Sequence, residues 1–257
     1  MEEELNYDLE RERELADGMR RQLNEEQVSC FNDIVAAVEL HYQQAPQQGS
    51  SGACFLHGPA GTGKTFLYNC LCSHFRSLGK IVLYVTSSGI AALLLPGGRQ
   101  AHSRFKITLS NDINAVCNIT RNLALAELIR NTSLIIWDEV PMQHKACFEA
   151  VSRTLNDICN VDGQQVFGSI PTVLGGDFTQ IMPVIRRGTR QATVNAGIQH
   201  DSIWEYLRVL KLKTSMRVTA SDANRVFLTF LKDLATNPHH SGWCELPGYI
   251  CEVYIVD

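Results

Sequence analysis

The sequence predicts an α/β fold in which an open parallel sheet is covered by helices on both faces. Apolar runs of strand length alternate along the 257 residues with segments whose apolar residues recur at helical spacing, and this alternation is typical of parallel sheets. The runs at 80–86 and 133–138 are apolar almost throughout, as strands buried on both faces should be. A glycine-rich turn at 58–65 joins an earlier apolar run, at 53–57, to the helical pattern that follows the turn.

Two helices are expected before the sheet begins. Residues 1–22 are dense in charge and carry only a weak apolar period, which predicts a solvated helix at the margin of the fold. Asn24 can cap the next helix, and Gln27 stands three positions on as its capping-box partner. That helix is expected to turn four apolar residues inward: Phe31, Ile34, Val35 and Val38.

The remaining elements follow in alternation after a polar loop at 43–52. Strands are expected at 53–57, 80–86, 133–138, 172–175 and 209–212. Helices are expected at 66–75, 90–95, 123–130, 148–159 and 222–235.

The glycine-rich turn predicts that the chain binds a nucleoside triphosphate. It reads Gly58-Pro59-Ala60-Gly61-Thr62-Gly63-Lys64-Thr65 and fits the pattern G-x-x-x-x-G-K-[ST] between a strand and a helix. Glycines let successive backbone N–H groups curl around a phosphate, and the helix N-terminus adds partial positive charge. Lys64 is then placed to reach the terminal phosphates, and the Thr65 hydroxyl to hold Mg²⁺.

Two acidic residues end the strand expected at 133–138. A carboxylate at this position projects from the carboxyl edge of a parallel sheet, where the ligands of open α/β folds bind. Asp138 is predicted to hold magnesium together with Thr65, and Glu139 to polarise the attacking water.

Two later strand ends carry further candidates. Gln180, in Gly175-Gly176-Asp177-Phe178-Thr179-Gln180, offers a neutral amide that can sense the terminal phosphate. The alternative is a simple polar turn, since Gly-Gly-Asp suits turns. Arg217 follows the last strand and can stabilise phosphoryl transfer; the alternative is an exposed structural arginine.

A polar and basic string follows the second strand. It begins with Ser87, Ser88 and Gly89 and continues with Arg99, His102, Arg104, Phe105 and Lys106. Basic side chains with an aromatic among them suit a single-stranded backbone and a stacked base, although a solvated basic loop is the alternative. The net charge of −4 does not decide the question, because residues 1–27 hold ten acidic residues against four arginines and the rest of the chain sums to +2.

Composition indicates an intracellular protein without a membrane partner. No run of eighteen apolar residues occurs. The acidic start fits neither a secretory signal nor a mitochondrial presequence. Nine scattered cysteines are typical of reduced thiols.

Together these strings resemble the petite-integration-frequency (Pif-one) family of superfamily-one DNA helicases, in particular its plant Helitron-transposon-like branch. Residues 23–27 are similar to the family's Q motif, in which Gln27 would read adenine. The motifs numbered I to IV are matched by Gly58–Thr65, Ile136–Met142, Gly175–Gln180 and Met216-Arg217. The string from Ser87 to Phe105 resembles the region implicated in single-strand contact, and it assigns DNA binding to Ser87, Ser88, Gly89, His102, Arg104 and Phe105.

The resemblance implies a RecA-like P-loop NTPase fold with ATP and Mg²⁺ as cofactors and single-stranded DNA as partner. It also implies 5′-to-3′ helicase activity in DNA repair, recombination or telomere maintenance. A nuclear location is implied first, and a mitochondrial one is known in the family.

The family uses two RecA-like domains, and we expect the second to be absent here. The expected division is a charged helix at 1–22, a RecA-like ATP-binding domain at 23–220 and a truncated connecting segment at 221–257. These residues alone should then unwind DNA weakly or not at all.

Two other function classes remain open from the sequence. One is an ATP-binding adaptor, or an inactive transposon-derived remnant, that binds nucleotide without turnover stimulated by DNA. The other is a P-loop ATPase of the clamp-loader type, which shares the first two motifs but leaves Gln27 and the 87–105 string unexplained.

Overall fold

A computed structural model describes residues 6–43, 52–93, 96–108, 112, 114–161 and 165–216, and beyond these residues 226, 229, 230, 233 and 234. The chain divides into two compact units, Met1–Ser215 and Met216–Asp257. The described sheet and the helices that cover it belong to the first unit.

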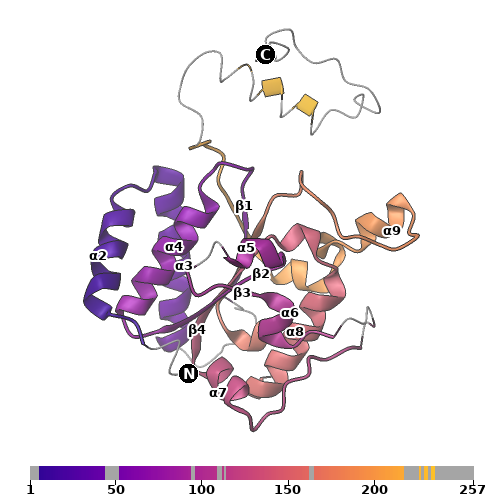
Figure 1. Ribbon diagram of the computed structural model, residues 1–257, viewed down its shortest axis with the longest axis horizontal. Helices are drawn as coiled ribbons and strands as arrows, with labels where there is room; N and C mark the ends of the chain where they lie inside the picture. The colour runs from indigo at the N-terminus through magenta and orange to yellow at the C-terminus, as the bar shows by residue number, and fades with distance from the viewer. Residues whose placement is uncertain are drawn as a thin grey trace, which may run out of the picture. The chain divides into compact units, whose positions relative to one another are not determined.

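Six parallel strands form one sheet in the order β3-β2-β4-β5-β1-β6 (Figure 1). Their bounds are β1 (Ala53–His57), β2 (Ile81–Thr86), β3 (Arg99–Gln100), β4 (Thr132–Asp138), β5 (Thr172–Gly176) and β6 (Arg208–Lys211). The predicted open parallel sheet is confirmed. Each of the five expected strands is present, and β3 is an addition that the sequence pattern did not indicate.

Alternate strand residues point into two separate cores, one on each face of the sheet. Phe55 and Ile135 lie in one core, whereas their neighbours Leu56 and Ile136 lie in the other. This two-sided burial is the reason that the central strands read as continuous apolar runs.

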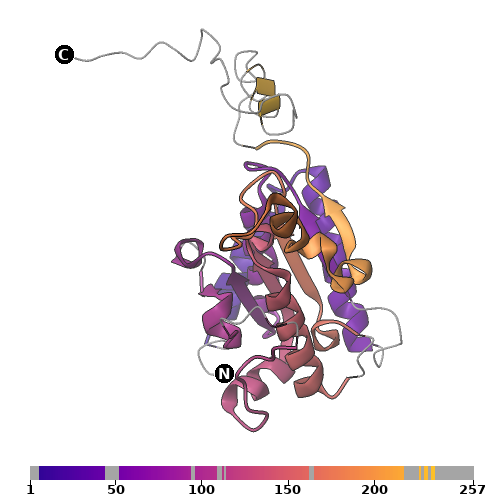
Figure 2. The ribbon, with the colours of Figure 1, turned by 90° about the vertical axis from the view of Figure 1, so that its right-hand side faces the viewer.

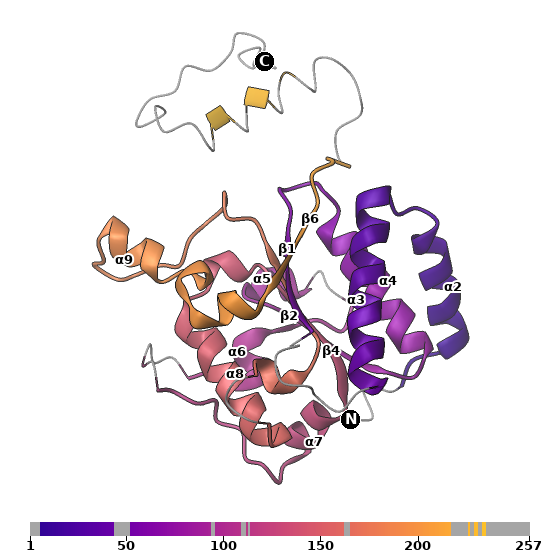
Figure 3. The same ribbon diagram turned by 180° about the vertical axis from the view of Figure 1, so that it is seen from behind.

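Helices cover both faces of the sheet (Figures 1 and 3). On one side lie α2 (Leu9–Arg20), α3 (Glu25–Gln43) and α4 (Lys64–Ser77). On the other lie α6 (Ala101–Phe105), α7 (Ala124–Arg130) and α8 (Lys145–Cys159). Short elements complete the unit: α5 (Gly89–Leu93), which stands at its edge in the side view of Figure 2, α9 (Arg190–Asn195), η1 (Val140–Met142), η2 (Phe167–Ser169), η3 (Ile198–His200) and η4 (Ser202–Tyr206).

The capping box predicted before α3 is confirmed. The backbone N–H of Gln27 donates to Asn24 Oδ1 at 2.9 Å, and the backbone N–H of Asn24 donates to Gln27 Oε1 at 3.0 Å. Each side chain thus satisfies a backbone donor that the start of a helix leaves free. Phe31, Ile34 and Val38 turn inward as expected.

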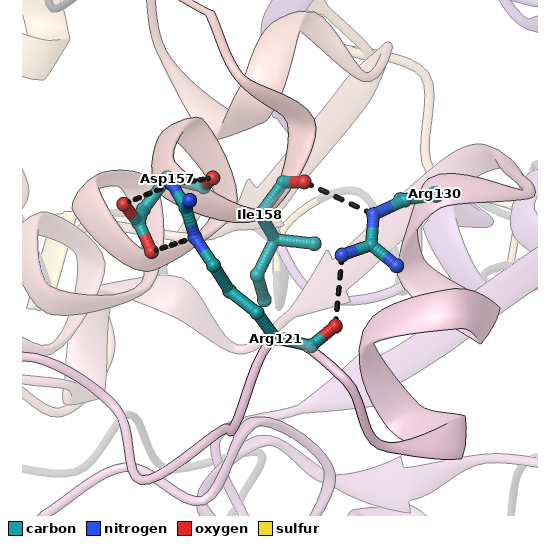
Figure 4. Close-up of polar contacts among 4 residues, drawn as sticks. All are labelled: Arg121, Arg130, Asp157 and Ile158. Atoms are coloured by element: carbon teal, nitrogen blue, oxygen red, sulfur yellow. Dashed lines mark hydrogen bonds and ion pairs between the residues drawn. The ribbon is translucent and has the colours of Figure 1, made fainter.

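Two arginines fasten the segment before α7 to the end of α8 (Figure 4). The Arg121 guanidinium donates two hydrogen bonds to the Asp157 carboxylate, from Nε at 2.8 Å and from a terminal nitrogen at 2.5 Å. Arg130 donates to the carbonyls of Ile158 and Arg121. Because the Arg121 and Asp157 side chains are 51% and 62% exposed, solvent screens the ion pair and it contributes little to stability.

Two expected helices extend beyond what the structure describes. The helix expected at 90–95 corresponds to α5, and residues 94–95 lie outside the described residues. Most of the helix expected at 222–235 lies outside them as well. Across the described part of the chain, every helix is too short or too polar to pass through a bilayer.

Candidate functional site

The candidate site lies where β1, β5, β4 and β2 end side by side. β5 separates β1 from β4, with His57 opposite Gly176, and Thr86 of β2 lies opposite Asp138 of β4. The segments that follow these strands therefore leave the sheet at one edge, which is the edge where open α/β folds bind ligands.

The glycine-rich loop after β1 is preformed by its own hydrogen bonds. Thr62 Oγ1 donates to the Pro59 carbonyl at 2.9 Å, and Lys64 Nζ donates to the Gly58 carbonyl at 2.5 Å. Gly63 is left-handed, with φ of 81°, and α4 begins directly after it. Free N–H groups at the start of this 14-residue helix and the adjacent ammonium make a site for an anion.

Gln27 connects α3 to this loop. Its Nε2 donates to the Thr62 carbonyl at 3.1 Å while its Oε1 serves the capping box, and the side chain is only 1% exposed. One side chain therefore fixes both the start of α3 and the phosphate loop. Its predicted contact with adenine stays a prediction.

Asp138 ends β4 as a buried carboxylate. Burial raises its pKa to about 6, against a smaller opposite effect of the hydrogen bond that it accepts from the backbone N–H of Glu139 at 2.9 Å. Glu139 itself has a positive φ of 55°, which is uncommon for a residue other than glycine and is typical of functional positions. The sharp turn directs the chain from β4 into η1.

Replacing Asp138 should stabilise the ligand-free chain, because the buried charge opposes folding. The pKa of Asp138 in the folded state, about 6, lies above the unfolded value of about 3.9, so the folded chain binds this proton more tightly. The stability that the bound proton contributes is fully present below about pH 4 and is lost as the pH rises through about 6. We expect Asp138→Asn to raise the free energy of unfolding by roughly 2 to 3 kcal/mol at pH 7. The gain should shrink as the pH falls toward 4.

Urea unfolding at a series of pH values measures this effect. Glu205→Gln, at an exposed position in η4, is the control and should leave the free energy of unfolding at pH 7 within about 0.5 kcal/mol of the parent value. A variant Asp138→Asn that is less stable than the parent at pH 7 would contradict the account of Asp138.

A tight turn after β5 carries Gln180. Asp177 is 3% exposed, and its Oδ1 accepts hydrogen bonds from the backbone N–H of Thr179 at 3.0 Å and from Thr179 Oγ1 at 2.7 Å. Gln180 is exposed, with Nε2 at 3.5 Å from Asp177 Oδ2. The turn follows β5, which lies between β4 and β1 in the sheet, and the predicted role of Gln180 stays a prediction.

Gly175 ends the strand expected at 172–175, and β5 extends one residue further, to Gly176. A Cβ on Gly175 would stand 1.6 Å from the Tyr68 hydroxyl, and one on Gly176 would stand 2.2 Å from Pro141 Cδ. Both positions exclude side chains because neighbouring groups occupy the space.

Two tyrosines beneath the site were not predicted from the sequence. Tyr68 of α4 and Tyr84 of β2 are 0% and 1% exposed, and their rings meet edge to face with centroids 5.7 Å apart. Tyr68 follows Lys64 by four residues, and residues at this spacing share a helix face. This spacing is the only feature of the sequence that could have indicated that Tyr68 lies near the phosphate loop.

The start of the predicted DNA-contact string is tied to the strand that bears Asp138. The backbone N–H of Ser87 donates to the Asp138 carbonyl at 3.1 Å, and Trp137 Nε1 donates to Ser87 Oγ at 3.1 Å. Ser88 Oγ accepts from the backbone N–H of Ala91 at 3.5 Å, and Gly89 opens α5 as an exposed residue.

The later part of the string is folded rather than a loose basic loop. Arg104 and Phe105 lie in α6 and are 7% and 0% exposed, and the Phe105 ring packs against Trp137 at 5.6 Å. Phe105 is therefore a core residue in this structure and is not available for stacking on a base. His102 is half-buried, and burial lowers its pKa.

Arg217 lies outside the described residues. The residues before it are held near the phosphate loop, because Glu26 Oε2 accepts from the backbone N–H groups of Lys213 at 2.7 Å and Thr214 at 3.1 Å. Glu26 precedes Gln27, so one turn of α3 contacts both the phosphate loop and the segment after β6.

The oxygen donors at the edge of the sheet fit a magnesium ion shared with phosphates. Thr65 is exposed in the first turn of α4. The Asp138 carboxylate is buried, and its described hydrogen bond is the one that it accepts from the backbone N–H of Glu139. The described residues contain no group of three or more His, Cys, Asp or Glu able to hold a metal without further ligands. Magnesium in nucleotide sites needs only one or two protein ligands besides phosphate oxygens.

Comparison with known proteins decides the family. A family model described as PIF1-like helicase matches residues 22–235. The chain belongs to the PIF1-like helicase family. The match includes the phosphate loop, Asp138 and Glu139 at the end of β4 and the Gln180 turn, whereas the whole of α2 precedes it.

Curated relatives of this PIF1-like chain include ATP-dependent DNA helicases. It is 32% identical over 136 residues to the helicase Pif1 of Psychrobacter sp., covering 52% of this chain and 20% of the relative. It is 34% identical over 139 residues to that of Campylobacter jejuni, covering 51% and 29%. The PIF1-like chain thus spans less than a third of either relative.

Solved Pif1 structures share its RecA-like P-loop fold. The Candida albicans helicase superposes with a TM-score of 0.65 at 24% identity, over 83% of this chain and 44% of that one. A Bacteroides Pif1 bound to single-stranded DNA superposes with a TM-score of 0.61 at 21% identity, over 86% and 47%. At these identities the likeness shows the fold alone, and the chain spans about half of each helicase.

Proposed function

We propose that the chain binds ATP with Mg²⁺ and hydrolyses it in response to single-stranded DNA, as part of a 5′-to-3′ DNA helicase. One observation carries the proposal. The phosphate loop, Asp138, Glu139 and the Gln180 turn meet at one sheet edge, and Ser87 at the head of the DNA-contact string is hydrogen-bonded to the carbonyl of Asp138.

The proposed roles of the residues are those that the sequence motifs imply. Lys64 exchanges its hydrogen bonds to loop carbonyls for bonds to the terminal phosphates. Thr65 and Asp138 hold the metal, which supplies positive charge to the phosphates when it is bound. Glu139 orients and polarises the attacking water. Gln180 and Arg217 contact the terminal phosphate, and Gln27 reads the adenine.

Hydrogen bonds give the proposed DNA contact a short path to the ATP site. Ser87 bonds both Trp137 and Asp138, the last two residues of β4. Single-stranded DNA bound at Ser87, Ser88 and Gly89 would therefore contact residues that are hydrogen-bonded to the end of β4, where Asp138 lies. His102 would support this contact from α6, whereas Arg104 is buried there. The solved Bacteroides Pif1 bound to single-stranded DNA favours such a partner.

From the sequence resemblance we further propose that the chain belongs to the Helitron-like branch, acts in DNA repair, recombination or telomere maintenance, and is located in the nucleus.

The Lys64→Ala variant tests the nucleotide site. We expect its affinity for a fluorescent ATP analogue with Mg²⁺ to fall by roughly 10- to 100-fold, because hydrogen bonds to charged groups contribute about 1.5–3 kcal/mol. Lys106→Ala, at an exposed position in the turn after α6, is the control and should bind like the parent. Equal affinity of Lys64→Ala and the parent would place nucleotide binding elsewhere or rule it out.

A further inference from the structure

The hydroxyl groups of two buried tyrosines, Tyr68 of α4 and Tyr84 of β2, take no part in the proposed nucleotide and metal contacts. The hydroxyls of Tyr68 and Tyr84 have no hydrogen-bond partner among the residues that the structure describes. A buried hydroxyl left without a partner costs about 1–3 kcal/mol, and phenylalanine would fill the same space without that cost. Packing alone therefore does not explain tyrosine at these positions.

The Tyr68 hydroxyl occupies the gap that Gly175 leaves in β5. The point where a Cβ on Gly175 would stand is 1.6 Å from the Tyr68 hydroxyl oxygen and 3.5 Å from Asp138 Oδ1. The hydroxyl and the carboxylate thus lie beside the same point, on the same face of the sheet. The three heavy atoms nearest to that point are two atoms of Tyr68 and the Oδ1 atom of Asp138.

The Asp138 carboxylate can accept this hydroxyl. An ionised carboxylate has about four acceptor positions, and the described contacts of Asp138 include one backbone donor, the N–H of Glu139. Binding of a metal to one carboxylate oxygen leaves positions on the other side free. Carboxylates that bind metals are commonly held by further hydrogen bonds, and loss of these costs about 10- to 100-fold in metal affinity.

We propose that Tyr68 is a positioning residue for magnesium, whose hydroxyl donates a hydrogen bond to the Asp138 carboxylate when the metal binds with ATP. The inference rests on the proposed function and deepens it. Lys64 and Tyr68, one helical turn apart on α4, then serve the phosphates and the metal ligand respectively. Gly175 is required because its missing side chain admits the hydroxyl to this position.

Tyr84 has a different place and serves as the matched control. It lies in β2 opposite Ile136, two residues before Asp138 in β4. Its ring packs against Tyr68, and its hydroxyl is not among the atoms nearest to the Gly175 gap. Removal of its hydroxyl changes the same aromatic pair without removing the proposed donor.

The test is a magnesium titration of fluorescent ATP-analogue binding to the full chain, its Tyr68→Phe variant and its Tyr84→Phe variant. We expect Tyr68→Phe to raise the magnesium concentration at half-saturation by about 10-fold. Nucleotide binding in the presence of a chelator should not change. The midpoint of thermal unfolding of ligand-free Tyr68→Phe should equal or exceed that of the parent, because an unsatisfied buried hydroxyl has been removed.

Three results would overturn the inference. The first is an unchanged half-saturation in Tyr68→Phe beside a normal magnesium response of the parent, which leaves the proposed function intact. The second is an equal shift in Tyr84→Phe, which would show that the aromatic pair acts through packing. The third is a parent chain whose nucleotide binding does not respond to magnesium, which would remove the proposed metal site as well.

Discussion

The Glu139→Gln variant is expected to lose ATP turnover by at least about 100-fold while its affinity for ATP stays within about 3-fold of the parent value. General-base residues contribute about 10²–10⁴ to rate, and glutamine keeps the shape of the side chain without its basicity. Glu139 stands directly after Asp138, the proposed metal ligand, in a left-handed backbone conformation that few residues adopt. Steady-state phosphate release and equilibrium binding of a fluorescent ATP analogue measure the two quantities separately.

Glu205→Gln makes the same chemical change at an exposed position in η4 and should retain full turnover. Full turnover by Glu139→Gln would show that another group activates the water. A parent chain that binds ATP without releasing phosphate would instead support the adaptor interpretation.

The Gly175→Ala variant is expected to be destabilised by about 3 kcal/mol or more. The new methyl carbon would stand 1.6 Å from the Tyr68 hydroxyl and 2.8 Å from the ring carbon that bears it. Tyr68 is fully buried, so the ring has no free space to enter, and overpacking of a core typically costs about 1–3 kcal/mol, occasionally more. Urea unfolding followed by circular dichroism measures the change.

Gly18→Ala provides the contrast. Gly18 lies within α2, and no atom stands within 4 Å of its Cβ position, so alanine there should stabilise the chain by about 0.5–1 kcal/mol. In a Tyr68→Leu background the additional cost of Gly175→Ala should fall, because the phenol is gone. A Gly175→Ala variant as stable as the parent would contradict the close contact with Tyr68.

The parts of the fold that depend on local pattern could be predicted from the sequence. The strand at 133–138 is apolar because both its faces are buried, and its composition alone indicates this. The capping box of Asn24 and Gln27 and the phosphate loop are likewise local, since their residues are neighbours in the chain.

The parts that depend on distant contacts could not be predicted. Phe105 looked available for a base because basic residues flank it, yet the ring packs on Trp137 of a distant strand. β3 has two residues, both exposed, and gives no pattern. The strand that ends with Gly175 was expected, but the approach of Tyr68 from α4, which leaves no space for a side chain at Gly175, has no signal in the sequence.

The most direct test of the proposed function is steady-state phosphate release by the parent chain with and without single-stranded oligothymidine. The account predicts that the oligonucleotide stimulates release several-fold, that blunt duplex DNA of the same length does so less, and that Lys64→Ala abolishes the response. Phosphate release that is the same with and without the single strand would contradict the coupling of DNA contact at Ser87 to ATP hydrolysis at Asp138.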